Sequence, residues 1–228
     1  MRLSTCHSPF DAHVNLTRSC ESHHIFFQLW PALREAGFRE PFEQPMETRG
    51  FNGEERYGVA LSTRPPLGPL IGGRFDPFPH SRMGRGLLLA RCDWPGMGTV
   101  VLGTAHLESY VGAKEQERVV PERRDQLKVA AHTLAMEATE HFAPAAVLLG
   151  DMNWNDKSDG DPLEVLGSGW SDAFVAAGKP RGMYATLNGG RYRIDRAFVW
   201  QNHRTQSLPP WSAAGLGTQV GGYLALLP

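Results

Sequence analysis

Asp151 and Asn153 stand two positions apart, directly after a run of apolar residues. The run, residues 146–150, has the length of a buried β-strand and ends in glycine. In an extended backbone, residues i and i+2 point to the same side, so the carboxylate and the amide would project together just past the strand. In open α/β sheets, this end of a strand is where ligands usually bind. The pair could therefore act on a substrate, although Asp and Asn after a glycine also serve as ordinary turn residues.

Two more strand-like stretches carry polar side chains. Residues 99–105 are mostly apolar or β-branched and lead into His106 and Glu108, while Asp195 lies within the stretch 191–200. A carboxylate can take a proton from water, and imidazole and amide groups can stabilise negative charge that develops in a transition state. Three strands that each deliver such a group predict a catalytic site.

Some of these residues also have a structural interpretation. Asp195 and its neighbour Arg196 could form an ion pair within a strand, and His106 and Glu108 could both be strand-surface residues. Glu108 could face the site as a metal ligand, but the pattern does not decide this. We therefore leave the metal ligands unassigned.

The elements that must position these residues follow from the apolar pattern. Residues 94–98 are expected to form a hairpin connection that pairs the strand after Arg85 with the strand that leads to His106. The other expected elements are strands at 25–28, 57–62 and 221–227, a helix at 29–36 ended by Gly37, a loop at 39–53, and a helix after Trp170 capped by Ser171 or Asp172.

A longer helix is expected between Pro121 and Phe142. Its apolar face consists of residues spaced by three and four, namely Leu127, Ala130, Ala131, Leu134 and Ala138. We assign Arg123, Lys128 and Glu140 to the opposite, solvated face.

Composition limits the class of protein. The chain has 228 residues, a net charge of −1 and a pI near 6.8, so a nucleic-acid contact would need a local basic patch. Its three cysteines have no CxxC spacing, and no apolar run has the length of a signal peptide core or a membrane span. We expect an intracellular protein of the nucleus or cytoplasm, monomeric and without membrane contact, with a loop or disordered segment at 1–24 and one domain at 25–228.

The polar residues form an ordered set of short motifs. The set is His106-Leu-Glu-Ser109, Arg124-Asp-Gln126-Leu127, Gly150-Asp151-Met-Asn153 and Ile194-Asp195-Arg196. In this order it resembles the endonuclease/exonuclease/phosphatase (DNase-I-like) superfamily. The flanking Pro77-Phe78-Pro79, Met83-x-Arg85 and Gly178-Lys179-Pro180 are similar to one branch, the tyrosyl-DNA phosphodiesterases of the second type.

This resemblance implies a fold and a reaction. The fold is a four-layer α/β sandwich, in which two mixed β-sheets pack face to face with helices outside, and we expect it to be incomplete at both ends here. The reaction is hydrolysis of a phosphodiester with Mg²⁺, or Mn²⁺ in its place, as cofactor. The partner is DNA with a 5′-tyrosyl adduct, or another phosphodiester substrate, in DNA repair.

The resemblance also assigns roles to residues. Asp151 activates the attacking water, Asn153 binds a phosphate oxygen, His106 contacts the phosphoryl group, and Asp195 supports the site by hydrogen bonding. The expected substrate-binding residues are Ser109, Arg124, Gln126 and Thr186.

The chain departs from the family pattern at two motifs. Gln28 is followed by Leu29 where the family has a metal-binding Glu, and the residues before Tyr223 lack the expected Ser-Asp-His. Because a catalytic metal supplies several kcal/mol of charge stabilisation, we expect a truncated or degenerate domain with slow or no turnover. A general nuclease or phosphatase of the superfamily, and an inactive phosphate-binding relative, remain alternatives.

Overall fold

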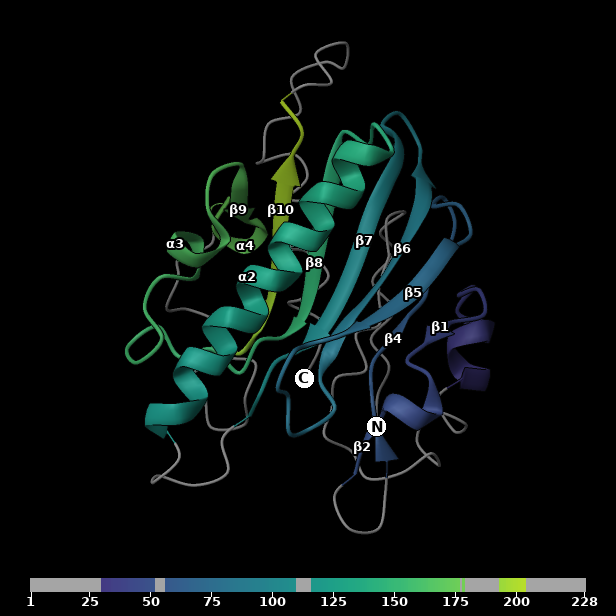
Figure 1. Cartoon of the computed structure of the whole chain (residues 1–228). Helices are drawn as coiled ribbons and strands as arrows, with labels where there is room; N and C mark the ends of the chain where they lie inside the picture. Colours follow the sequence, from purple (N-terminus) through teal and green to yellow (C-terminus); the bar gives the residue numbers. More distant parts are fainter. Residues whose placement is uncertain (1–29, 52–55, 110–115, 177, 179–192, 204–228) are drawn as a thin grey trace.

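The computed structural model describes residues 30–51, 56–109, 116–176, 178 and 193–203. A six-stranded mixed sheet forms its centre, in the order β5-β6-β7-β8-β10-β9 (Figure 1). β7 and β8 run parallel, and the other neighbours are antiparallel. The strands of this sheet are β5 (Ile71–Pro77), β6 (Gly86–Trp94), β7 (Gly98–His106), β8 (Ala145–Asp151), β9 (Trp170–Asp172) and β10 (Asp195–Gln201).

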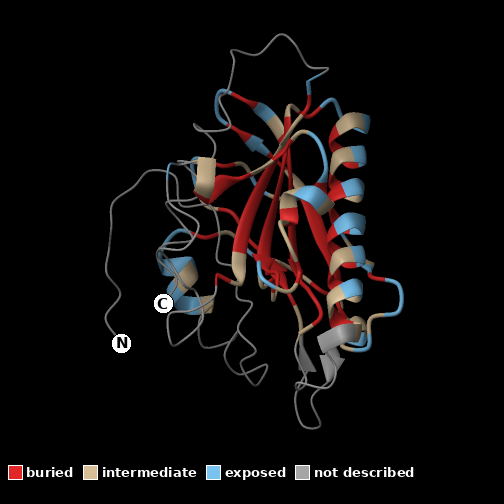
Figure 2. Cartoon of the chain, turned by 90° about the vertical axis from the view of Figure 1, so that its left-hand side faces the viewer, coloured by how far each residue is buried: buried red, intermediate tan, exposed pale blue. Residues whose placement is uncertain are grey.

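Helix α2 (Gln116–Glu140) covers one face of this sheet, and buried residues fill the space between them (Figure 2). Alternate side chains of each strand point to this face, as the two-residue period of a strand requires. The apolar layer includes Leu87, Leu89, Val101, Leu127, Leu134, Leu148 and Phe198. The predicted arrangement of a helix packed outside a mixed sheet is confirmed.

The second face of the sheet packs against a smaller layer. β1 (Phe42–Glu43) and β4 (Ala60–Leu61) form a two-stranded antiparallel sheet, and the core on this side includes Val59, Leu61, Val100, Leu102, Val147, Leu149 and Val199. β2 (Gly50–Phe51) and β3 (Arg56–Tyr57) pair separately. The main sheet thus has an apolar core on each face, and the predicted α/β class is confirmed.

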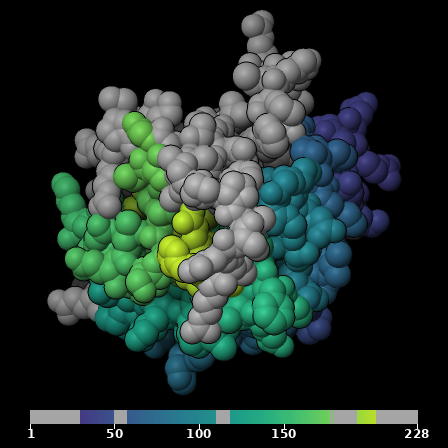
Figure 3. Space-filling view, turned by 90° about the horizontal axis from the view of Figure 1, so that it is seen from above, coloured from purple at the N-terminus to yellow at the C-terminus, as the bar shows by residue number. Residues whose placement is uncertain are grey.

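Short helices and turns complete the described chain. They are the helical residues 30–35, η1 (Met46–Thr48), α3 (Pro162–Leu166) and α4 (Ala173–Ala176). Gly37 ends the first of these with φ at 87°, as predicted. Seen from above (Figure 3), the last residues of β10, in yellow, lie beside the green segment that holds α3, β9 and α4.

Three local predictions need correction. α2 begins at Gln116 and contains Pro121, so it extends further than expected. Arg123 is not on the solvated face, because it is four residues before Leu127 and is only 1% exposed. The chain forms β9 from Trp170 before the expected helix, α4, begins, and Asp172 caps this helix, as predicted, by accepting from the backbone N–H groups of Phe174 and Val175.

Several expectations fall outside the described residues, namely the loop at 1–24, the strands at 25–28 and 221–227, and Thr186. The expected loop at 39–53 contains β1, η1 and β2. Across the ranges that the structure describes, no helix is both long and apolar enough to cross a membrane.

Candidate active site

Strand register brings three of the predicted residues together. His106, the last residue of β7, is the direct partner of Asp151, the last residue of β8. Asp195, the first residue of β10, is the partner of Asp151 on its other side. The carboxyl ends of two parallel strands and the start of an antiparallel one therefore meet at a single edge of the sheet.

The imidazole and the carboxylate lie close at this edge. His106 Nε2 is 3.6 Å from Asp151 Oδ2, and the two side chains are 7% and 11% exposed. The other carboxylate oxygen, Oδ1, accepts a hydrogen bond of 2.8 Å from the backbone N–H of Asn153. The carboxylate is thus fixed on one oxygen, while the second faces His106.

Asn153 joins the loops that follow β7 and β8. Its backbone has φ at 45°, a left-handed conformation that Asn tolerates better than most residues. Its Nδ2 donates to the carbonyl of Leu107 at 3.0 Å. Since an amide nitrogen carries two hydrogens, one donor remains for another acceptor.

Gly150 explains why a glycine precedes Asp151. Its φ is 147°, and a Cβ built at this position would lie 1.8 Å from the carbonyl oxygen of Ala105 on β7. Only a residue without a side chain permits this approach of the two backbones. The glycine therefore allows the pairing that places His106 beside Asp151.

The surroundings of Asp151 favour its protonated form. Burial and, to a lesser extent, the negative charge of Asp195 raise the pKa of its carboxyl to about 7. The backbone N–H of Asn153 and the cations Arg85 and Arg123 oppose these effects. A carboxyl with this pKa can accept a proton near neutral pH.

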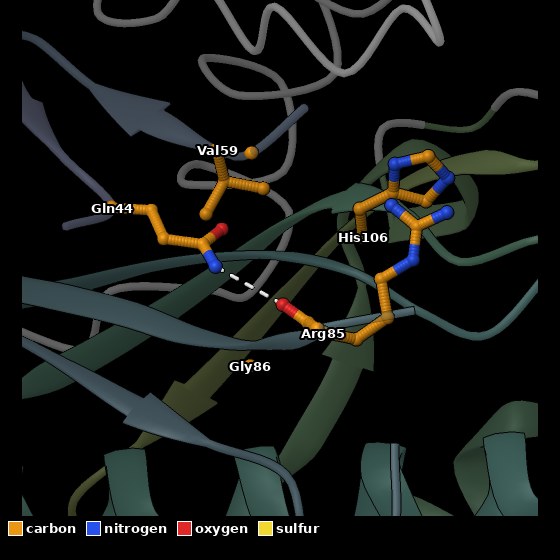
Figure 4. A pocket seen from close by; sticks show the side chains of 7 residues that line it. Gln44, Val59, Arg85, Gly86 and His106 are labelled. Carbon is orange, nitrogen blue, oxygen red and sulfur yellow. Dashed lines mark hydrogen bonds between the residues drawn. The ribbon is translucent and has the colours of Figure 1, made fainter. Parts of the chain in front are cut away.

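His106 is held in its neutral form. Burial lowers the pKa of this imidazole well below its ordinary value, and the nearby charge of Arg85 lowers it further. Figure 4 shows the Arg85 guanidinium beside the imidazole in a small pocket, which Gln44 and Val59 also line. Two of the lining residues are joined directly, because Gln44 Nε2 donates to the carbonyl of Gly84 at 3.0 Å.

Three of the predicted substrate-binding residues already make hydrogen bonds within the protein. Ser109 Oγ donates to Met83 Sδ at 3.5 Å, and Arg124 Nη1 donates to the carbonyl of Asp159. Gln126 is 4% exposed, with its amide bound to Glu108. Their contact with a substrate stays a prediction, and Thr186 is outside the described residues.

Sequence reasoning did not assign a role to Arg85 or to the buried Arg123. Arg85 stands in the Met83-x-Arg85 motif, but the sequence does not reveal that its guanidinium lies beside His106. The spacing of four between Arg123 and Leu127 was the available signal that Arg123 faces the core.

Comparison with known proteins identifies the family. The model of the Endonuclease/Exonuclease/phosphatase family matches residues 20–215. The chain belongs to this family. Membership agrees with the motif order His106, Asp151, Asn153 and Asp195, and it places the chain among the superfamily's phosphodiesterases.

Solved structures share the fold of this Endonuclease/Exonuclease/phosphatase domain. D. rerio TDP2 complexed with single strand DNA product is 23% identical, with a TM-score of 0.57 over 81% of this chain and 69% of that chain. TDP2 from C. elegans is 18% identical, with a TM-score of 0.55 over 76% of this chain and 51% of that chain. The human Nocturnin catalytic domain with bound sulfate anion is 14% identical, with a TM-score of 0.55 over 78% of this chain and 66% of that chain. No curated protein sequence matches the chain.

Family membership implies a divalent cation, which would need several oxygen ligands near Asp151. Mg²⁺ takes oxygen ligands, of which Asp151 and Asp195 offer two carboxylates. The carboxylate of Glu108 already has hydrogen-bond partners within the protein. The residue is 2% exposed, and its carboxylate accepts from Ser81 Oγ at 2.9 Å and from Gln126 Nε2 at 3.1 Å. Within the described ranges, no three acidic, His or Cys side chains at Asp151 gather closely enough to hold an ion. The described part of the site therefore does not fit the cation that the family implies.

One group of the required kind lies elsewhere. Glu137, Glu140 and His141 offer ligand atoms within 4.8 Å of one another. However, His141 Nδ1 is 2.6 Å from Arg91 Nη1, and its Nε2 is 3.3 Å from Glu137 Oε1. Glu137 also accepts from Arg74 Nη1 at 2.7 Å. Glu137 Oε1 also lies 3.8 Å from Arg91 Nε. Because these contacts occupy both imidazole nitrogens and bring two guanidinium groups to Glu137, this group is an ion-pair network.

Proposed function

We propose that the chain hydrolyses a phosphodiester bond, specifically the 5′-phosphotyrosyl bond of DNA during DNA repair. One observation carries the proposal: His106, Asp151 and Asn153 converge at adjoining strand ends, with Asp151 Oδ2 3.6 Å from the imidazole. The pKa of about 7 at Asp151 supports its use as a general base.

The proposed reaction uses these three groups on one phosphorus. Asp151 takes a proton from water, and the water oxygen forms a bond to phosphorus while the bond from phosphorus to the tyrosyl oxygen breaks. The phenolate takes a proton from solvent and Asp151 returns its proton to solvent, so the products are free tyrosine, or a peptide, and a 5′-phosphate. The neutral His106 and the remaining amide hydrogen of Asn153 donate to phosphoryl oxygens, where negative charge develops.

The leaving group suits this site. A phenol has a pKa of about 10 and leaves more easily than a sugar hydroxyl, so a strong general acid is not required. The motifs around Pro79, Arg85 and Lys179 support the tyrosyl-DNA branch, and a TDP2 structure that shares the fold is complexed with single strand DNA product. We accordingly propose an intracellular, monomeric protein with DNA as its partner.

A bound divalent cation would add positive charge to stabilise the phosphoryl transition state. This is worth several kcal/mol, on the order of a thousandfold in rate. Because the described donors do not fit such an ion, we assign no step to it. We expect slow turnover, or turnover that requires a high concentration of Mg²⁺.

The test is an assay with matched substrates. Purified protein is mixed with a 5′-phosphotyrosyl oligonucleotide, the same oligonucleotide without tyrosine, an RNA of the same sequence and a soluble phosphomonoester, with and without Mg²⁺. We expect release of tyrosine from the first substrate and its loss in Asp151→Asn. Preference for plain DNA, RNA or the monoester would refute the tyrosyl assignment and favour a general nuclease or phosphatase.

The donor set at Asp151 also favours one second candidate, a phosphate-binding relative without catalysis. Such a protein would bind the 5′-phosphorylated oligonucleotide through His106 and Asn153 but would not turn over any of the substrates. Binding without turnover at every Mg²⁺ concentration would identify it.

A further inference from the structure

Four buried polar side chains lie behind the site, and we call them the polar bracket. They are Glu108, Arg123, Gln126 and Asp159, which are 2%, 1%, 4% and 1% exposed. Two of them belong to α2, one follows β7, and one lies in the loop after β8. A buried charge is costly unless it is paired, so their contacts show what they hold together.

Arg123 bonds to both catalytic loops at once. Its Nε donates to Asp159 Oδ1 at 2.9 Å and its Nη2 to Asp159 Oδ2 at 3.2 Å, in the loop after β8. Its Nη1 donates to the carbonyl of Glu108 at 3.3 Å, in the loop after β7. A guanidinium is a planar, rigid fork, so these bonds set the separation of the two loops.

Asp159 organises the loop that begins at Asn153. Besides Arg123, its carboxylate accepts from the backbone N–H of Asn155 at 3.0 Å and from Ser158 Oγ at 3.0 Å. The same loop is joined to the end of β7 through the hydrogen bond from Asn153 to Leu107. The position of Asn153 therefore depends on a short loop that Asp159 and Arg123 fix.

Glu108 extends the bracket to a third loop. Its backbone N–H donates to Gln126 Oε1 at 2.8 Å, and its carboxylate accepts from Gln126 Nε2 and Ser81 Oγ. Ser81 Oγ in turn accepts from the backbone N–H of Arg85 at 2.8 Å. The loop that presents Arg85 to His106 is thus tied to α2 as well.

We propose that Arg123 is a positioning residue, which sets the spacing of His106, Asp151 and Asn153 from behind the site and never touches substrate. Gln126 acts with it, by orienting Glu108 through both ends of its amide. The kinetic part of this inference rests on the proposed function, whereas its structural part does not. The positive charge of Arg123 also lowers the pKa of Asp151, as one of the lesser influences on that carboxyl.

Two substitutions separate geometry from charge. Arg123→Lys keeps the charge but loses the fork, because an ammonium cannot hold Asp159 in two places and reach Glu108. Arg123→Met keeps most of the apolar stem and loses both. The control is Arg118→Met on the same helix, which removes a more exposed ion pair of 2.9 Å with Glu122.

Two readouts are used, both on variants whose circular dichroism and cooperative unfolding show a folded chain. The first is kcat and KM on the 5′-phosphotyrosyl oligonucleotide. The second is the titration of the Asp151 carboxyl by ¹³C NMR, which needs no turnover. Arg123→Met leaves the carboxylate of Asp159 buried without its cationic partner, which could prevent folding. The double variant Arg123→Met/Asp159→Asn removes that unpaired charge, and its kcat and KM are measured if the single variant does not fold.

We expect Arg123→Lys and Arg123→Met to lower kcat by roughly 10²-fold with little change in KM, the scale of loss for small misplacements of catalytic groups. The double variant should show the same loss. The Asp151 titration should move to higher pH in Arg123→Met and stay in place in Arg123→Lys. Arg118→Met should match the unmodified protein in both readouts.

The inference is overturned if folded Arg123 variants keep the kcat of the unmodified protein and its Asp151 titration. If the unmodified protein releases no tyrosine, the proposed function fails, but a crystal structure of Arg123→Lys still decides the structural part. Unchanged positions of His106, Asp151 and Asn153 in that variant would refute positioning by Arg123.

Discussion

Asp151 and Asp195 occupy directly paired positions on the antiparallel strands β8 and β10. Burial is the main reason that the pKa of Asp151 rises to about 7, and the negative charge of Asp195 is the second. The carboxylate of Asp195 thus adds repulsion to the effect of burial at Asp151. Together they make Asp151 a base suited to neutral pH.

The rate of phosphodiester hydrolysis should follow the titration of Asp151. We expect kcat/KM to rise with pH up to about 7 and then level off, because the base must be deprotonated to accept a proton from water. Asp195→Asn removes the repelling charge and should shift this midpoint to lower pH. A profile that is flat between pH 5 and pH 9, or one that Asp195→Asn does not move, would contradict the assignment.

Asp151→Asn should stabilise the fold while it abolishes hydrolysis. The folded pKa of Asp151 lies above its unfolded value of 3.8, so its stability contribution is complete below pH 3.8 and is lost as pH rises through about 7. The charge should cost up to about 4 kcal/mol above pH 7. Asparagine keeps an oxygen that can accept from the N–H of Asn153. Urea unfolding at pH 5 and pH 8 measures this, and an equal effect of the substitution at both pH values would count against it.

His106 should remain neutral where an ordinary histidine is protonated. Its folded pKa is lowered by burial and by Arg85, so protonation favours the unfolded chain and stability falls as pH drops below about 6.5. Arg85→Met should raise the pKa of the imidazole, which ¹H–¹⁵N NMR of His106 reports directly. A His106 imidazole that titrates near the ordinary value of about 6.5 would disprove the effect of burial.

Gly150→Ala should disrupt both the fold and the site. The new Cβ would lie 1.8 Å from Ala105 O, so β7 and β8 must separate where His106 meets Asp151. We expect a loss of at least 3 kcal/mol in the free energy of unfolding, the scale of severe core substitutions. Gly96→Ala is the matched control, since Gly96 also has positive φ, at 78°, but has open space around it. Its cost should be about 1 kcal/mol, and comparable losses in the two variants would refute the steric explanation.

The sequence was sufficient to predict four strands of the main sheet, β6, β7, β8 and β10, and the helix α2 that covers it. Long apolar runs mark β6, β7 and β8, and the turn residues at 94–98 mark the hairpin that the register of Trp94 with Gly98 confirms. The strands β1, β2 and β5 could not be predicted in the same way. They are short or rich in Gly and Pro, and cross-strand partners far along the chain stabilise them, as in the pairing of Phe42 with Leu61.

The candidate site was predictable in part for the same reason. His106, Asp151, Asn153 and Asp195 stand at strand ends that apolar runs identify, so their proximity follows from parallel and antiparallel pairing. The contacts of Arg85, Arg123 and Asp159 depend on how three loops fold onto α2, which no local pattern encodes. The burial of Arg123 is different, because its spacing of four from Leu127 was a signal, although a charged residue on a helix is ordinarily read as exposed.

The position at which a phosphate binds tests the proposed site most directly. A crystal structure of the chain with a 5′-phosphorylated oligonucleotide, the product of the proposed reaction, measures this position. We expect phosphate oxygens within hydrogen-bond distance of the His106 imidazole and the Asn153 amide, with Asp151 on the side from which water would attack. A phosphate bound away from the ends of β7 and β8, with none of these three side chains in contact, would contradict it.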